Sequence, residues 1–140
     1  MKNIILLILL AFCQAVHSQQ LYIYGGSNHD NFLGSLNSSI YDSNSIWNEY
    51  GTYGNPYNPN SIWNEYGTYG NKYSSYSPWN EYAAEPPVIV DGDGNFYGYF
   101  TVNKYKPQRA DFNLALIMYK YHDLIREDIS KWYKKIFQGY

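Results

Sequence analysis

The clearest hydrophobic pattern lies in the last third of the chain. Apolar side chains recur there at steps of three and four residues, which is the spacing of one face of an amphipathic α-helix. Pro107 is suited to begin this helix, because proline at a first helical position loses no hydrogen bond, and Asp111 is a later alternative cap. Gly139 follows the end of the helix. The sequence therefore predicts one long helix over residues 107–137. Its apolar face comprises Leu114, Met118, Tyr121, Ile125, Ile129, Trp132 and Ile136.

Residues 88–102 have the period-two pattern of a β-hairpin. Val88-Ile89-Val90 is a β-branched run, and the turn-forming segment 91–95 separates it from a stretch in which aromatic residues alternate with small or polar ones. Near the start of the chain, Leu21–Tyr24 could form a short edge strand that Gly25-Gly26 would end. The rest of residues 19–40 is predicted to be polar loop.

Between these segments a sixteen-residue unit occurs three times. Trp47, Trp63 and Trp79 lie sixteen residues apart, and so do the Ser and Tyr residues that flank them. Copies at a fixed period predict structural copies that stack on one another, with an atypical last copy as a cap. The Ser two residues before each Trp is suited to cap a one-turn helix, which the Gly after the Glu-Tyr pair would end. Stacked Trp rings are expected to hold these short turns together.

Together these patterns predict an α+β fold: a short aromatic-rich repeat stack of one-turn helices and turns, a β-hairpin, and one long C-terminal amphipathic helix. The expected organisation is a signal peptide over residues 1–18, a polar segment over 19–40, three repeats over 41–87, and the hairpin plus helix over 88–140. Residues 19–140 are expected to form one domain.

The first eighteen residues have the features of a secretory signal. Lys2 supplies the positive charge, residues 4–12 form an apolar run, and Val16-His17-Ser18 offers a cleavage site. Cleavage between Ser18 and Gln19 would place the mature protein in the periplasm or outside the cell. The apolar run is shorter than the about 20 residues that span a bilayer, so no transmembrane span is expected in the mature chain. The alternative is lipidation of Cys13, although the bulky Phe12 beside it fits a lipobox poorly.

Composition narrows the classes of partner. Cys13 is the single cysteine, so the mature chain would have no disulfide. The full chain has 18 Tyr, 4 Trp and 6 Phe, and these large aromatic residues must supply the core. The formal net charge is −2, with acidic residues concentrated in the repeats and basic residues after residue 104. A surface that binds nucleic acid would have a denser cluster of Lys and Arg residues than this chain has. We therefore expect no nucleic-acid partner and interpret the two charged regions as solvated faces of one fold.

The turn segment of the hairpin is a candidate calcium loop. Asp91, Asp93 and Asn95 have the spacing of the first ligands of an EF-hand. Phe96 and Val102 stand where that loop needs Gly and Glu, which favours a plain hairpin turn.

Candidate catalytic residues are few. His29 and His122 are the histidines outside the predicted signal, and no serine lies in a Gly-x-Ser-x-Gly elbow. A nucleophile, a base and an orienting group cannot be assembled from these residues. We expect no catalytic residue, no metal site, no cofactor and hence no enzyme.

The Trp and Tyr residues that recur in the three repeats are the candidate binding surface. Aromatic rings stack on sugar faces, neighbouring Asn and Glu bond to sugar hydroxyls, and repeated weak sites give avidity. The same groups could enclose a quaternary ammonium through cation–π attraction. In the competing interpretation the Trp rings form the core, and the Tyr residues, which carry a polar tip, are half exposed. The candidate binding residues are Trp47, Glu49, Tyr50, Trp63, Glu65, Tyr66, Trp79, Glu81 and Tyr82.

The repeat wording Ser-Ile-Trp-Asn-Glu-Tyr-Gly-Thr-Tyr-Gly and the segment Pro86–Tyr99 resemble a family of small secreted bacterial proteins rich in Tyr and Trp. The resemblance covers residues 32–102 and implies an exported location and a repeat-plus-hairpin architecture, with no activity attached. Relatives of this type carry Leu-Gly-Cys-Leu-Asn-Cys where this chain has Leu33–Ser38, so any disulfide or metal held by those cysteines is missing here.

These observations predict an exported, non-catalytic binding or structural protein of the cell envelope, with glycan as the ligand class. The alternative is a protein-interaction or inhibitor module that contacts an envelope protein through the hairpin edge or the exposed helix face.

Overall fold

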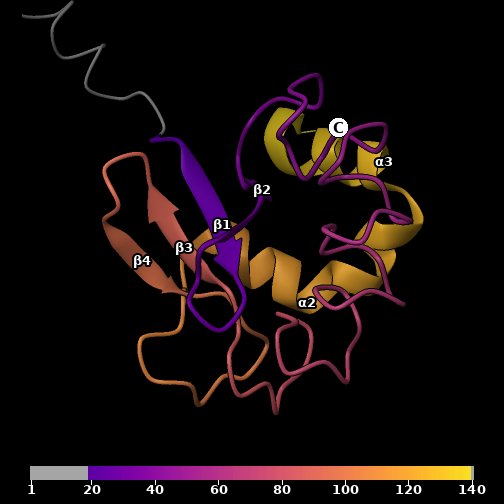
Figure 1. The fold of residues 1–140 in the computed structure, drawn as a ribbon. Helices are drawn as coiled ribbons and strands as arrows, with labels where there is room; N and C mark the ends of the chain where they lie inside the picture. Colours follow the sequence, from indigo (N-terminus) through magenta and orange to yellow (C-terminus); the bar gives the residue numbers. More distant parts are fainter. Residues whose placement is uncertain (1–18, 140) are drawn as a thin grey trace, which may run out of the picture.

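The computed structural model describes residues 19–139, and the predicted signal peptide, its cleavage site and Cys13 lie outside or at the limit of this range. The elements are strands β1 (Leu21–Gly25), β2 (Asn31–Ser35), β3 (Val88–Asp91) and β4 (Phe96–Tyr99), helices α2 (Asn113–Glu127) and α3 (Ile129–Tyr133), and a π-helical turn η1 (Lys134–Gln138). In Figure 1 the sheet lies to one side, and the coil of residues 40–87 lies beside it with the helices running along the coil. None of the helices in residues 19–139 has the length and apolar character needed to cross a membrane.

The sheet has four antiparallel strands in the order β2-β1-β3-β4, so the predicted fold with a single hairpin is wrong. β3 and β4 form the expected hairpin. β1, however, is a central strand, and β2 lies in a segment that was expected to be loop. The sequence pattern did not indicate β2 because this strand contains the polar or small residues Asn31, Gly34 and Ser35. Gly34 also takes a φ of 115°, which only glycine adopts readily. A bulge near Ile23 and Tyr24 accommodates this irregular pairing.

The repeats are a continuous chain of turns and contain no helix, which corrects the expectation of one-turn helices. Each turn is closed by a backbone N–H that bonds to the carbonyl three residues earlier, and the last residue of one turn is the first of the next. From Ser39 these bonds link residues 42, 45, 48 and 51, and a bond from Asn55 to Gly51 then takes a four-residue step. Four steps of three and one of four give the sixteen-residue period. We call the resulting coils rung 1 (residues 39–54), rung 2 (55–70) and rung 3 (71–83).

The expected long helix over 107–137 is also wrong. The residues just before Asn113 are hydrogen bonded to the sheet and are not helical. The backbone carbonyl of Tyr99 in β4 accepts from the N–H of Ala110 at 2.8 Å, and the N–H of Tyr99 donates to the carbonyl of Gln108 at 2.9 Å. Helix α2 ends before Asp128, whose φ of −155° and ψ of 79° are not helical. The Asp128 carboxylate then accepts from the N–H of Lys131 and begins α3. The predicted apolar face is divided among α2, α3 and η1.

The core of the molecule is a stack of indoles. The ring centroids of Trp47 and Trp63 lie 5.8 Å apart, and those of Trp63 and Trp79 lie 5.6 Å apart. Non-repeat aromatic rings close both ends of the stack: Phe137 packs on Trp47 at 5.5 Å, and Phe100 packs on Trp79 at 5.4 Å. These rings bury a large area without any disulfide.

The C-terminal helices follow the stack in the reverse direction, from rung 3 to rung 1. His122 stacks on Trp79 of rung 3 at 4.6 Å, the Nε–H of Arg126 donates to the Trp63 carbonyl of rung 2 at 3.0 Å, and Tyr133 packs on Trp47 of rung 1 at 6.2 Å. The spacing of the indoles is close to the pitch of an α-helix, about 5.4 Å, which matches the four-residue step from His122 to Arg126. The step from Arg126 to Tyr133 is seven residues, because the non-helical Asp128 interrupts the helix between them.

Candidate functional site

Each rung directs its Trp inward by the same local hydrogen bonds. The Ser hydroxyl two residues before the Trp accepts from the Trp backbone N–H, at 3.0 Å for Ser45 and 3.1 Å for Ser61 and Ser77. This is the acceptor role expected from the sequence, but it closes a turn and not a helix. The Trp side chain then donates to a carbonyl outside its own rung, at 2.7 Å from Trp63 to Ile46.

An Asn in each rung directs the following Tyr outward. The side-chain amide of Asn64 donates to the carbonyl of Asn58 at 3.1 Å, and its oxygen accepts from the N–H of Tyr66 at 3.1 Å. Asn48 and Asn80 form the same pair of bonds in rungs 1 and 3. Because the Asn is held at both ends, the Glu between Asn and Tyr and the Tyr itself project from the coil in equivalent positions.

The structure therefore separates the predicted binding residues into two groups. Trp47 and Trp63 have no solvent exposure and Trp79 has 4%, so the indoles belong to the core. Tyr50, Tyr66 and Tyr82 are 83–89% exposed. Glu65 and Glu81 are exposed, and Glu49 is half-buried. Tyrosine and glutamate, and not the tryptophan rings, form the accessible surface of the repeats.

A second row of tyrosines was missed as part of the site. Tyr41, Tyr57 and Tyr73 are 80–91% exposed. The side chain of the residue two positions earlier accepts the backbone N–H of each, for example Asn55 for Tyr57 at 2.9 Å. Their sixteen-residue spacing was visible in the sequence and could have included them, since they obey the same period as the other row.

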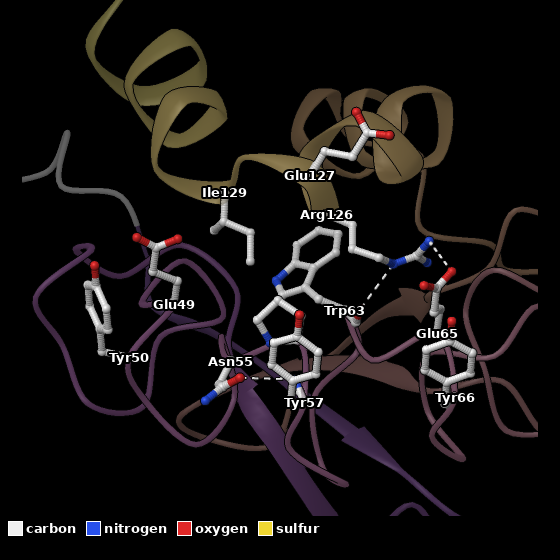
Figure 2. Close-up of a pocket in the computed structure, with 11 residues that line it drawn as sticks. Glu49, Tyr50, Asn55, Tyr57, Trp63, Glu65, Tyr66, Arg126, Glu127 and Ile129 are labelled. Atoms are coloured by element: carbon white, nitrogen blue, oxygen red, sulfur yellow. Dashed lines mark hydrogen bonds and ion pairs between the residues drawn. The ribbon is translucent and has the colours of Figure 1, made fainter.

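The two rows border a groove that crosses all three rungs, which we call the tyrosine groove. Its largest pocket has a volume of about 620 Å³ and lies between Tyr50, Tyr57 and Tyr66 on the coil and Arg126 and Ile129 on the helices (Figure 2). Pockets of about 370, 360 and 340 Å³ continue it toward both ends. Adjacent pockets share lining residues. The shared residues include Tyr50, Tyr66 and Tyr73.

The helices form the other wall of the groove. Nη1 of Arg126 lies 3.2 Å from an Asp123 oxygen and 3.8 Å from a Glu65 oxygen, and Figure 2 shows its side chain reaching from α2 across to rung 2. The Ser130 hydroxyl donates to Glu49 at 3.4 Å. Two of the three repeat carboxylates are therefore positioned by contacts from the helices.

His29 and His122 are held by packing and by backbone carbonyls. The ring of His122 lies parallel to that of Trp79, with an interplanar angle of 2°, and its Nδ1 is 3.0 Å from the Tyr119 carbonyl. His29 Nε2 is 3.0 Å from the Pro86 carbonyl. Among residues 19–139, neither of these histidines has a carboxylate or hydroxyl as hydrogen-bond partner, although His122 Nε2 lies 3.7 Å from an oxygen of exposed Asp123.

The hairpin turn uses the Asp91 carboxylate for its own structure. The two oxygens accept from the backbone N–H groups of Asp93 and Asn95 and from the side chains of Asn95, Gln19 and Tyr97, all at 2.9–3.1 Å. The hydrogen bond from the Asn95 side chain, followed by others in the turn, holds the pKa of Asp91 below its ordinary value. Among residues 19–139 no group of three or more His, Cys, Asp or Glu side chains is arranged to hold a metal ion.

No protein-family model, no curated protein and no solved structure matches this chain.

Proposed function

We propose that the protein is an exported, non-catalytic glycan-binding protein of the cell envelope, and that the tyrosine groove is its binding site. One observation carries the proposal: six tyrosines that are at least 80% exposed stand in two rows along a groove that runs over three equivalent rungs. An isolated exposed tyrosine needs no explanation, but contiguous exposed aromatic surface marks binding sites.

The chemistry of the groove suits a polyhydroxylated ligand. Tyrosine rings offer flat apolar faces and a hydroxyl that can donate or accept, and glutamate carboxylates accept hydrogen bonds from hydroxyl groups. Three equivalent sites of modest affinity act together on a polymer through avidity. The predicted signal sequence supports a location where cell-wall and host polysaccharides are found.

The binding proposal is tested on a glycan array with the purified protein, followed by isothermal titration calorimetry. The informative variant replaces Tyr50, Tyr66 and Tyr82 by Ala, and Tyr105→Ala is the matched control because Tyr105 is 81% exposed and borders none of the groove pockets described above. We expect the triple variant to lose binding and the control to retain it. Absence of binding to every polysaccharide, or equal loss in both variants, would overturn the proposal.

Export is tested separately. Expression of the full chain in a bacterial host should yield a secreted or periplasmic species that begins at Gln19, measured by mass spectrometry. Recovery of the uncleaved chain from the cytoplasm would contradict this part of the proposal.

A second candidate function is protein interaction through the outer face of α2. Leu116 and Leu124 are 42% and 49% exposed and lie two helical turns apart on the same side. The hairpin edge is less available, since Tyr99 of β4 already pairs with the segment around Arg109. Capture of an envelope protein that persists in excess free sugar and is lost in Leu124→Glu would favour this function over glycan binding.

A further inference from the structure

We infer that the tyrosine groove takes an extended β-1,4-linked hexopyranose chain that lies along the stack with one sugar residue per rung and carries no net negative charge. The inference rests on the proposed glycan-binding function and adds the linkage, the direction and the charge class of the ligand.

The first argument is the spacing of the rungs. The ring centroids of equivalent indoles are separated by 5.8 and 5.6 Å, and we take this distance as the spacing of the rungs. One hexopyranose residue in an extended β-1,4-linked chain advances by nearly the same length. Such a chain can place one ring beside each of rungs 1, 2 and 3, with successive rings turned by about half a rotation about the chain axis. An α-linked chain that coils, or a flexible 1,6-linked chain, does not keep this register.

The second argument is the direction of the groove. The pocket beside rung 1 shares Glu49 and Tyr50 with the largest pocket, which shares Glu65 and Tyr66 with the next. That third pocket shares Tyr73 with the one beside rung 3. The site is therefore elongated across the rungs, which is the shape that an extended polymer fills.

The third argument is the equivalence of the three sets of side chains. Each rung contributes one tyrosine from each row and one glutamate to the pocket linings, as Tyr57, Tyr66 and Glu65 do in rung 2. The corresponding groups are Tyr41, Tyr50 and Glu49 in rung 1 and Tyr73, Tyr82 and Glu81 in rung 3. Identical groups at an identical spacing recognise a ligand that is itself periodic.

The fourth argument is charge. Five carboxylates line the groove pockets, and the cationic side chains among the lining residues are Lys72 and Arg126. Arg126 already faces Asp123 and Glu65. A uronic-acid polymer would bring further carboxylates against this surface and be repelled, whereas neutral and amino sugars would not.

The experiment is a length series measured by isothermal titration calorimetry. Cello-oligosaccharides and chito-oligosaccharides of one to six residues are compared with oligomannuronates of the same lengths, which have the same β-1,4 linkage and one carboxylate per residue. Each added residue up to the third should tighten binding roughly two- to tenfold, the range expected for one aromatic contact, and affinity should then level off. At low ionic strength the oligomannuronates should bind roughly tenfold more weakly than the neutral chains.

The outcomes separate this inference from the proposed function. Binding of a monosaccharide as tightly as a hexasaccharide, or preference for oligomannuronates or for α-linked chains, would overturn the inference and leave glycan binding standing. Failure of every saccharide to bind would overturn both.

Single variants test the assignment of one sugar to each rung. Tyr50→Ala, Tyr66→Ala and Tyr82→Ala should each weaken hexasaccharide binding by a similar factor, and Tyr105→Ala should not change it. Loss confined to one rung would contradict the periodic arrangement. Circular dichroism spectra that superpose for all four variants establish that the exposed substitutions leave the fold intact.

Discussion

The indole N–H of Trp63 donates a 2.7 Å hydrogen bond to the carbonyl oxygen of Ile46, which lies one rung earlier in the stack. Trp79 forms the same bond with Ile62 at 2.6 Å, and Trp47 with Leu36, ahead of the first rung, at 2.7 Å. The Trp residue thus has two functions in each rung: its ring fills the core, and its one polar atom joins consecutive coils. Phenylalanine could perform only the first of these functions, because it has no donor.

Replacing Trp63 by Phe should therefore destabilise the protein beyond the loss of ring volume. The Ile46 carbonyl would be left without its donor in the interior, at a cost of about 1–3 kcal/mol. Urea denaturation followed by circular dichroism measures the change in the free energy of unfolding. Tyr66→Phe in the same rung is the control, and because Tyr66 is 83% exposed it should shift stability by less than about 0.5 kcal/mol. Equal midpoints for the two variants would contradict the role of the inter-rung bond.

The glycine near the end of rung 2 is predicted to be irreplaceable. A Cβ added to Gly70 would lie 2.0 Å from the backbone oxygen of Asn64, so Gly70→Ala must displace the Asn64 turn, at a cost of about 1–3 kcal/mol or more. Gly92→Ala is the matched control, since a Cβ there meets nothing within 4 Å and the substitution restricts the unfolded chain. Thermal denaturation should show a lower midpoint for Gly70→Ala and an unchanged or higher one for Gly92→Ala. A Gly70→Ala variant as stable as the parent would show that the turn is not tightly packed.

Acrylamide quenching should report the burial of the indole stack directly. Trp132 lies outside the stack and is only partly buried, so Trp132→Phe leaves fluorescence from the three repeat indoles alone. The emission of this variant should be blue-shifted, and its quenching constant several-fold below that of free tryptophan amide. Quenching as efficient as that of the free amide would mean that the rings are accessible to solvent.

The hairpin turn should weaken in acid through Asp91. Its pKa is below the ordinary value of 3.8 in the folded protein, so the stabilisation is present above that value and is lost as pH falls through the lower pKa of the folded state. Thermal midpoints of the parent and of Asp91→Asn should therefore differ at pH 6 and converge below about pH 4. Asp93→Asn, at an exposed position, should follow the parent at every pH. A difference between the parent and Asp91→Asn that stays constant down to pH 2 would contradict the assignment.

The spacing of Trp47, Trp63 and Trp79 was sufficient to predict a stack, because the stack depends on contacts between copies of one unit. The form of each unit was not predictable in the same way. Ser45 and Gly51 suit the ends of a helical turn, but Asn48 uses its side chain to bond to the backbone on both sides, and this competes with helix formation.

The sheet and the helix boundaries depended on long-range pairing that local patterns do not contain. β2 is held by its pairing with β1, and nothing within Asn31–Ser35 resembles an alternating strand. The residues after Pro107 suit a helix, but the hydrogen bonds of Tyr99 with Gln108 and Ala110 hold them against the sheet. The candidate site was predicted in part: the period identified Tyr50, Tyr66 and Tyr82, while the helix side of the groove, Arg126 above all, could be found only in three dimensions.

His122 contacts rung 3, Arg126 contacts rung 2 and Tyr133 contacts rung 1. The length of the helical segment therefore matches the number of rungs that it covers. Duplicating a sixteen-residue unit would add one more indole, which would then lack a covering side chain unless about one further helical turn were inserted near the C-terminus. Proteins built on this plan can therefore lengthen only by coordinated insertions at two distant points of the gene, and the size of the repeat array is fixed by a segment that contains no repeat.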